Sequence, residues 1–526
     1  MLRKLGYTDK EIGEFISGPA YFAWWQMNNL EGWGGPLPPE WYDNQEKLQK
    51  KIMRRMRSLG IEPVLPGYAG MVPRNIGEKL GYKIEDPGTW CGFPRPAFLS
   101  TTDEHFDYIA DLYYEELGKL YGKAAYYSMD PFHEGGKTKG VDLGAAGTKL
   151  MAAMKRANPD AKWVIQSWQD NPKQALTDAL ESGDLIILDL YSDKLPKWNI
   201  GGGYGKHDWI YCMLLNFGGN VGLHGRMNTV VDGFYDAMSG DAGKHLVGVG
   251  ATPEGIENNP VMYELLFELP WRERFKAEEW LKGYLKARYA LDSIPQDINQ
   301  AWKELYSTVY NAPVAYDADG TVESVFCARP AWNVKSASSW RSARLYYYAY
   351  STSHAAELLE RHNGNSNYKY DAVDVRRQAN ADRGNELLMT MADLKETGKE
   401  MCDKDSLKAL SNEFLALILK QDSLLRGCKE MNVDTWLDAA GSLAGDDIEA
   451  RRQYRKNAAM LITVWGDSTA ANRGGLRDYA HREWSGLLRD LYYKRWKAFF
   501  DSELDGAPTP DYYKMECDWV ERRSRE

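Results

Sequence analysis

The sequence predicts an α/β protein with a (β/α)8 TIM-type barrel over residues 1–275 and an all-α domain over residues 276–526. Up to residue 275, short apolar runs alternate with amphipathic stretches, which is typical of a parallel sheet with crossover helices. The segment Asp184–Leu190 is apolar on both faces, as buried parallel strands are. Beyond residue 275 the strand pattern stops and helical periodicity takes over.

Seven apolar, β-rich runs predict the strands of the barrel. They are Tyr21–Met27, Glu62–Ala69, Ala124–Pro131, Trp163–Trp168, Leu185–Tyr191, Trp209–Phe217 and Leu246–Ala251. The amphipathic segments between them predict helices at Trp41–Leu59, Asp103–Tyr121, Gly144–Ala157 and Pro172–Ser182. Because the loops after barrel strands carry the chemistry, the polar and aromatic residues just beyond the runs are candidates for function. These residues are Asn28, Glu134, Trp168, Asn216 and Glu254.

The C-terminal half predicts only helices, each of ten or more residues. The predicted ranges are Ala277–Ala290, Asp297–Val309, Ala343–Arg361, Val373–Lys395, Leu407–Lys429, Asp447–Thr463 and Arg477–Phe500. Stretches rich in Gly, Asp and Asn around Asn363–Asn367 and Gly466–Gly475 predict turns. A second, largely α-helical domain is the simplest account.

Composition excludes several classes of function. The 526 residues contain 65 Lys and Arg against 75 Asp and Glu, a net charge of -10, which argues against nucleic acid or an anionic membrane as a partner. No window approaches 18 uninterrupted apolar residues, so no membrane span is expected. The six cysteines lie far apart without a CxxC pair, and HExxH, GxSxG and a helix-opening GxGxxG are absent. The sequence therefore predicts neither a metal nor a cofactor.

Aromatic residues are abundant, with 19 Trp and 33 Tyr. Flat aromatic faces suit the apolar faces of sugar rings, so a carbohydrate site is one interpretation. The other interpretation is that these aromatic residues fill a large core, and composition alone favours this second interpretation.

Two glutamates carry the predicted chemistry. Glu134 follows an aromatic strand and precedes a Gly pair, and Glu254 follows the run Leu246–Val249 with Gly next to it. Two carboxylates at strand ends suit glycoside hydrolysis, in which one protonates the leaving oxygen while the other attacks or activates water. The alternative is that each glutamate is a loop residue that caps a helix.

At these residues the sequence resembles glycoside hydrolase family 89, the α-N-acetylglucosaminidases. In the barrel the matching motifs are Gly18–Asn29, Gly35–Pro39, Pro63–Gly70, Asp130–Gly136, Cys212–Asn220 and Pro253–Ile256. In the helical part they are Tyr370–Asp374, Arg377-Gln378, Ile462–Gly466, Asp478-Tyr479 and Tyr493–Trp496. The resemblance covers nearly the whole chain and implies a (β/α)8 catalytic domain followed by an α-helical domain.

The resemblance also implies roles for single residues. Glu134 matches the family's general acid/base and Glu254 its nucleophile, in a retaining exo-α-N-acetylglucosaminidase that acts on glycans with a terminal α-linked N-acetylglucosamine. His133 stands where the family often has Asn, and its charge would shift the pKa of its neighbour. The residues expected to bind the sugar are Trp24, Met27, Trp90, His133, Trp168, Tyr211 and Asn216.

One departure from the family concerns the N-terminus. By the resemblance, we expect this chain to begin after the first barrel strand of the family. The seven predicted strands, instead of eight, agree with that expectation of an incomplete barrel. We therefore expect poor expression and little activity from the chain as given, and expect an upstream extension to restore both. If an upstream signal is missing, the resemblance implies a periplasmic, secreted or lysosomal setting.

Two alternative functions stay open. The first is an α-glycosidase that acts on another hexose, and the second is an inactive carbohydrate-binding remnant.

Overall fold

The computed structural model describes residues 1–132, 134, 138–215, 217–254, 258–337, 342–396, 404–469, 471–472 and 481–526. The chain divides into two compact units. The first comprises Met1–Cys212 and Asp236–Gly250, and the second comprises Met213–Tyr235 and Ala251–Glu526.

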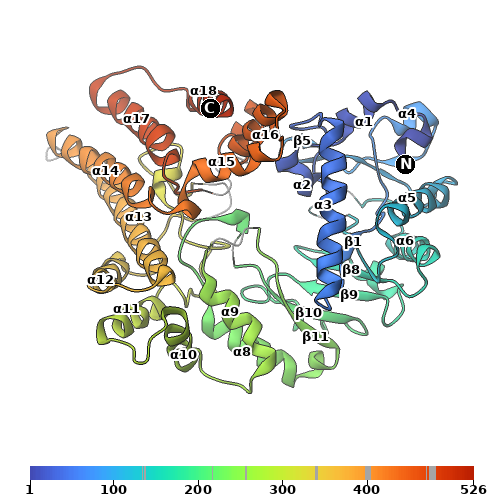
Figure 1. Ribbon diagram of the computed structural model, residues 1–526, viewed down its shortest axis with the longest axis horizontal. Coiled ribbons are helices and arrows are strands. Elements are labelled where there is room, and N and C mark those ends of the chain that lie inside the picture. The colour runs from blue at the N-terminus through green and yellow to red at the C-terminus, as the bar shows by residue number, and fades with distance from the viewer. Residues whose placement is uncertain are drawn as a thin grey trace. The chain divides into compact units, whose positions relative to one another are not determined.

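A six-stranded sheet lies at the centre of the first unit (Figure 1). In spatial order its strands are β1 (Val64–Pro66), β7 (Tyr126–Ser128), β8 (Lys162–Ser167), β9 (Leu185–Asp189), β10 (Asp208–Met213) and β11 (Leu246–Ala251). The pairs from β1 through β10 are parallel. Each of these strands overlaps a range that the apolar pattern predicts, so the parallel sheet is confirmed.

The predicted strand at Tyr21–Met27 is wrong. Pro19–Tyr21 forms a 3-10 turn and Phe22–Gln26 forms helix α2. Pro19 stands at the first position of that turn, where its fixed φ favours helical backbone. The segment also contains no β-branched residue to favour extended backbone, so its apolar character comes from aromatic residues that face neighbouring rings. Trp25, for example, stacks on Phe22 with ring centroids 5.2 Å apart.

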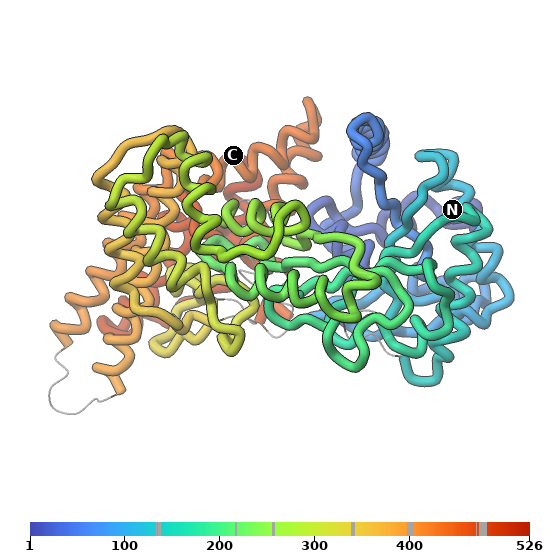
Figure 2. Tube along the Cα trace, turned by 90° about the horizontal axis from the view of Figure 1, so that it is seen from below, coloured from blue at the N-terminus to red at the C-terminus, as the bar shows by residue number. Residues whose placement is uncertain are grey.

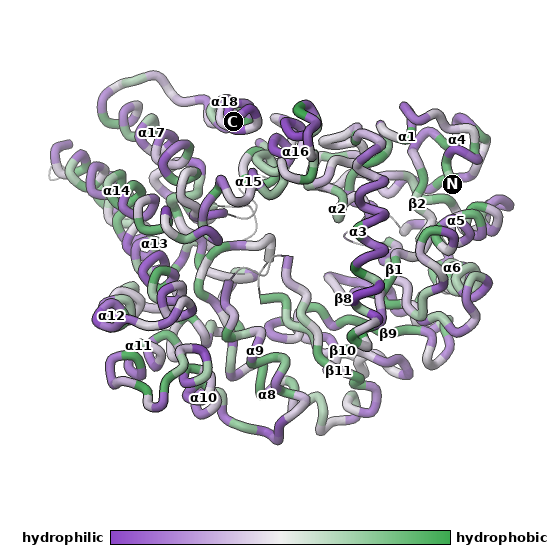
Figure 3. The backbone as a smooth tube through the Cα atoms, in the orientation of Figure 1, coloured by the Kyte–Doolittle hydropathy of each residue, from purple (hydrophilic) through white to green (hydrophobic). Residues whose placement is uncertain are grey.

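Four helices of the first unit lie at the predicted amphipathic segments: α3 (Pro39–Ser58), α5 (Phe106–Tyr121), α6 (Leu143–Ala157) and α7 (Gln174–Asp178). The short helices α1 (Asp9–Phe15) and α4 (Ile76–Leu80) were not predicted. Helices α5 and α6 pack against each other beside the sheet. Helix α3 is largely hydrophilic (Figure 3), and buries only Trp41 and Met53.

Small antiparallel sheets interrupt the barrel pattern between β1 and α5. One contains β2 (Met71–Val72), β6 (Ala97–Leu99) and β3 (Ile84–Glu85), and the other pairs β4 (Thr89–Trp90) with β5 (Phe93–Pro94). The sequence analysis did not predict them because strands of two or three residues are too short to show a period of two. They matter because they carry Trp90, Cys91 and Arg95.

The second unit is helical, as predicted. Its helices include α9 (Pro260–Glu268), α10 (Ala277–Tyr289), α11 (Gln296–Ser307), α12 (Ala349–Glu360), α13 (Ser366–Glu396), α14 (Lys404–Leu425), α15 (Val433–Ser442), α16 (Ile448–Leu461), α17 (Tyr493–Asp505) and α18 (Tyr512–Arg525). Helix α8 (Met227–Ser239) begins in this unit. The long helices α13 and α14 run side by side (Figure 2). Their core centres on aromatic rings, with Phe414 edge-on to Trp496 at 4.8 Å.

None of the described helices combines the length and the apolar character that crossing a membrane requires. Within the same residues, His, Cys, Asp and Glu side chains form no group of three or more that could hold a metal ion.

Candidate active site

Glu134 lies in the turn that follows strand β7. The Gln166 backbone N–H donates to Asp130 Oδ1 at 2.8 Å, which ties the start of this turn to β8. Phe132 and Glu134 both have left-handed backbone, with φ of 63° and 46°. Phe132 packs on Phe98 with ring centroids 4.9 Å apart. Because residues other than Gly rarely adopt positive φ, surrounding contacts must hold this turn in place.

Two buried side chains hold Glu134. Asn29 Nδ2 donates to Glu134 Oε2 at 2.8 Å. Arg95 Nη2 donates to the Glu134 backbone carbonyl at 2.5 Å, and Arg95 Nη1 donates to Asn29 Oδ1 at 3.1 Å. Asn29 is 0% exposed and Arg95 is 2% exposed, whereas Glu134 is half-buried. Asn29 thus binds the Glu134 carboxylate, Arg95 binds the Glu134 backbone carbonyl, and Arg95 and Asn29 bind each other.

Burial controls the protonation of the groups beside Glu134. Burial raises the pKa of the Cys91 thiol to about 12, with the Glu134 charge acting in the same direction and Arg95 against it. Cys91 is therefore a neutral thiol at physiological pH. Burial also lowers the pKa of Arg95 below its ordinary value, while Glu134 opposes that change. Arg95 remains the cation of this site, since an arginine keeps its proton in proteins.

Glu254 lies three residues beyond the end of strand β11, in the second unit. The Thr252 backbone N–H donates to the Met213 carbonyl at 3.0 Å and so continues the strand toward Glu254. The Gly218 backbone N–H donates to Glu254 Oε2 at 2.6 Å. The side chain of Glu254 is exposed. A backbone N–H that donates to a carboxylate stabilises its ionised form.

Asparagine side chains join the loop after β10 to the segment after Glu254. Asn258 Nδ2 donates to the Asn220 carbonyl, and Asn259 Nδ2 donates to the Gly222 carbonyl at 2.8 Å. The His224 backbone N–H donates back to Asn259 Oδ1 at 3.1 Å. These bonds hold together the two segments that supply Gly218 and Glu254.

Helix α13 and the segment from His481 support the same loop. Gln378 Oε1 accepts the Leu223 backbone N–H at 2.9 Å. Gly219 has φ +67°, and a Cβ built there would lie 2.4 Å from Arg482 Nη2. The Arg482 guanidinium lies 4.7 Å from the centroid of the Trp484 ring, so it has little room to withdraw. Only glycine fits between this arginine and Glu254.

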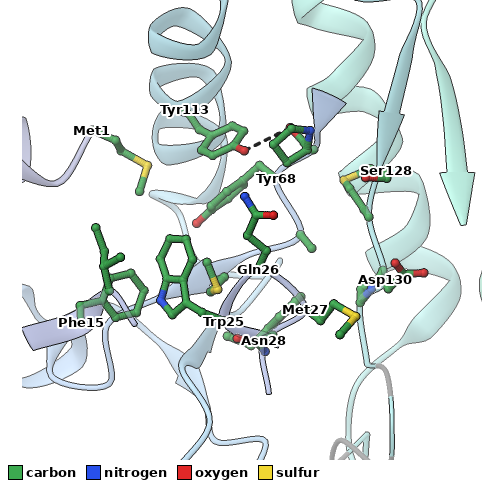
Figure 4. A pocket seen from close by; sticks show the side chains of 18 of the residues that line it. Met1, Phe15, Trp25, Gln26, Met27, Asn28, Tyr68, Tyr113, Ser128 and Asp130 are labelled. Carbon is green, nitrogen blue, oxygen red and sulfur yellow. Dashed lines mark hydrogen bonds between the residues drawn. The ribbon is translucent and has the colours of Figure 1, made fainter. Parts of the chain in front are cut away.

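A cavity of about 820 Å³ lies in the first unit at the carboxyl ends of β1 and β7 (Figure 4). Met27 and Asn28 line it together with Tyr68 and Asp130. Its volume is within the range of small-molecule pockets, which are about 300–1,000 Å³. Met27, predicted to bind the sugar, thus faces a space of suitable size.

The other predicted sugar-binding residues of the first unit differ in their surroundings. Trp24, Trp90 and Trp168 are half-buried, and Trp168 lies 6.1 Å from Tyr191 between ring centroids. Tyr211 is 0% exposed, and its hydroxyl donates to the Ser192 carbonyl at 3.3 Å. Tyr211 therefore packs in the core here, and its predicted contact with a sugar stays a prediction. The predicted site residues His133 and Asn216 lie outside the described residues.

Three groups that hold the two glutamates were not predicted from the sequence: Asn29, Arg95 and the Gly218 N–H. The sequence does indicate that Arg95 is unusual, because it is the only charged residue in the apolar stretch Phe93–Leu99. An arginine in such a stretch is buried only if its donors are satisfied, which predicts a structural or site role. Asn29 stood within the first quoted motif, but nothing local indicated which residue its amide would meet.

Comparison with known proteins agrees with this architecture. Residues 1–273 match the family model described as the alpha-N-acetylglucosaminidase (NAGLU) tim-barrel domain, and residues 280–524 match the corresponding C-terminal domain. The chain is 30% identical to human alpha-N-acetylglucosaminidase over 530 residues, which cover 96% of this chain and 68% of the human protein.

Solved structures of a relative from Clostridium perfringens show the same fold. A family 89 glycoside hydrolase in complex with PUGNAc has a TM-score of 0.93 and 36% identity, covering 99% of this chain and 60% of that chain. The same coverage and identity, with a TM-score of 0.94, hold for a variant with two Glu-to-Gln substitutions in complex with its substrate GlcNAc-α-1,4-galactose. This chain thus spans 60% of the clostridial relative's length.

A parallel barrel sheet with a glutamate beyond each of two strands defines the class of barrel glycoside hydrolases. Within that class, the chain belongs to glycoside hydrolase family 89, the α-N-acetylglucosaminidases.

Proposed function

We propose that this chain is a retaining exo-α-N-acetylglucosaminidase, with Glu134 as general acid/base and Glu254 as nucleophile. The observation that carries the proposal is that each glutamate follows the carboxyl end of a strand, β7 or β11, of one sheet. Each also has a hydrogen-bond donor on one carboxylate oxygen, Asn29 Nδ2 for Glu134 and the Gly218 N–H for Glu254. Family membership supports the assignment.

The chemistry of the substrate favours a protein nucleophile. In an α-linked N-acetylglucosaminide the leaving group and the 2-acetamido group lie on the same face of the ring. The acetamido oxygen therefore cannot displace the leaving group from behind, and a carboxylate must do so. For retention, the carboxyl groups of Glu134 and Glu254 should lie about 5–5.5 Å apart, compared with roughly 6.5–9.5 Å in an inverting enzyme. The reaction uses two carboxylates and water, so the proposal includes no metal or cofactor.

The proposal extends to the pocket and to the domains. We expect Trp24, Met27, Trp90 and Trp168 to form the walls of the N-acetylglucosamine subsite, where aromatic faces pack on the sugar ring. We also propose that catalysis belongs to residues 1–275 and that residues 276–526 form the helical domain.

The activity is tested with aryl α-glycosides in parallel assays. We expect hydrolysis of the aryl α-N-acetylglucosaminide and of GlcNAc-α-1,4-galactose, the substrate of the clostridial relative. We expect little hydrolysis of the matching α-glucoside, since it lacks the acetamido group. Faster cleavage of the glucoside would favour the alternative of a different hexose. Isothermal titration that shows N-acetylglucosamine binding without turnover would favour an inactive binding protein.

Gly219→Ala tests the support of Glu254. The added Cβ meets Arg482, so the loop that carries the Gly218 N–H should shift and kcat should fall by about tenfold to a hundredfold. Gly205→Ala is the matched control, because Gly205 has φ +60° with nothing within 4 Å of a built Cβ. Both variants should lose roughly 1–2 kcal/mol of stability from the left-handed backbone. Equal kcat values in the two variants would show that the clash with Arg482 is harmless.

A further inference from the structure

The hydrogen bonds around Glu134 fix the orientation of the Asn29 amide. A guanidinium has only N–H donors, so the Asn29 atom that faces Arg95 Nη1 at 3.1 Å must be the amide oxygen. The amide NH2 group is then the one that faces Glu134 Oε2 at 2.8 Å. Asn29 is therefore a donor to Glu134 and cannot exchange the two ends of its amide without losing both bonds.

This arrangement distinguishes the two oxygens of the Glu134 carboxyl. Oε2 accepts the Asn29 N–H whether Glu134 is protonated or ionised. In a carboxylic acid the carbonyl oxygen accepts a hydrogen bond better than the hydroxyl oxygen does. With the Asn29 N–H on Oε2, the proton of the acid form therefore belongs on Oε1.

Arg95 holds the other side of the residue. Its Nη2 donates to the Glu134 backbone carbonyl at 2.5 Å, next to the positive φ of 46°. Its backbone carbonyl in turn accepts from Arg74 Nη1 at 2.7 Å. Arg95 thus fixes both the Asn29 amide and the Glu134 backbone.

We infer that Asn29 and Arg95 are positioning residues that direct the transferable proton of Glu134 to Oε1. The inference deepens the proposed function and rests on it, because it assumes that Glu134 is the general acid/base. The Asn29 N–H binds the ionised carboxylate more strongly than the neutral carboxylic acid. The Arg95 guanidinium and the Cys91 thiol are among the charged and titratable groups that interact with Glu134.

The test compares Asn29→Ala, Asn29→Asp and Arg95→Lys with the wild-type chain. For Asn29→Ala we expect kcat on GlcNAc-α-1,4-galactose to fall by about tenfold to a hundredfold, with KM within about threefold. Hydrolysis of a dinitrophenyl α-N-acetylglucosaminide should fall much less, since its departure needs little protonation. Arg95→Lys keeps the charge but cannot reach both partners, so it should act in the same direction.

The pH profile separates positioning from a merely structural role. The alkaline limb of kcat/KM reports the protonated acid, so it should move to higher pH in Asn29→Ala. It should move further in Asn29→Asp, because the new carboxylate repels a negative charge at this position. Asn29→Asp keeps the shape of the side chain, so it carries the test if Asn29→Ala does not fold.

A matched control is Asn158→Ala. Asn158 Nδ2 donates to the Ala124 carbonyl at 2.8 Å, before the amino ends of β7 and β8, so its removal deletes a similar bond away from Glu134. Equal losses on both substrates in the Asn29 variants, with the alkaline limb unmoved, would overturn the inference. The proposed function fails separately, and the inference with it, if Glu134→Ala shows no dependence on the leaving group.

Discussion

Glu254→Ala is expected to abolish hydrolysis of every α-N-acetylglucosaminide, whereas Glu134→Ala is expected to spare activated substrates. Loss of a nucleophile removes the first chemical step; in another hydrolase class such a loss lowers kcat by about 10⁶-fold. Loss of the general acid costs about 10²–10⁴-fold, and mainly on substrates with poor leaving groups. The measurement is kcat and kcat/KM for each variant on a dinitrophenyl glycoside and on an alkyl glycoside.

Added azide distinguishes the two roles by stereochemistry. In Glu134→Ala the β-configured glycosyl-enzyme still forms, and azide attacks it from the opposite face to give the α-glycosyl azide. In Glu254→Ala azide can enter the space of the missing carboxylate and displace an activated leaving group directly, which gives the β-glycosyl azide. Proton NMR of the products identifies the anomeric configuration of each glycosyl azide. Recovery of the β-azide from Glu134→Ala would show that the roles of Glu134 and Glu254 are exchanged or that the assignment is wrong.

Arg377→Ala is expected to give the largest loss of stability in the helical unit. Arg377 is 0% exposed, and it donates to Asp374 Oδ1 at 2.8 Å and to Glu483 Oε2 at 2.6 Å. Burial already raises the pKa of Glu483, and Arg377 opposes that rise. Removing the cation leaves two buried carboxyl groups without their partner, which costs about 3–5 kcal/mol.

The neighbouring Arg376 provides the matched control. It forms a two-point ion pair with Glu360, whose side chain is 51% exposed. Exposed pairs contribute about 0–1 kcal/mol, so Arg376→Ala should change the free energy of unfolding by no more than that. Urea unfolding followed by tryptophan fluorescence measures both variants. A difference of less than about 1 kcal/mol between them would mean that the buried network does not stabilise the unit.

The apolar pattern of the chain was sufficient to predict most of the sheet. The run Leu185–Leu188 in β9 is apolar at every position, as expected for a strand of a parallel sheet that is covered on both faces. The ends of the runs lie within four residues of the ends of these strands, which was enough to place Glu134 and Glu254 beyond two of them. The pattern failed at Tyr21–Met27, where Pro19 and the aromatic side chains favour helix α2. An apolar run of seven residues does not by itself distinguish strand from helix.

Contacts between distant segments were beyond any local pattern. Asn29 and Glu134 are 105 residues apart, and Gly218 and Glu254 are 36 apart. The types of these residues indicate that they can form hydrogen bonds, but not with which partner. The partner of each residue depends on which loops the sheet and the packed helices bring together. It also depends on which donors and acceptors are buried and so cannot bond to water. The sequence was therefore sufficient to predict the candidate acid and nucleophile. The groups that orient them could be identified only in the folded structure.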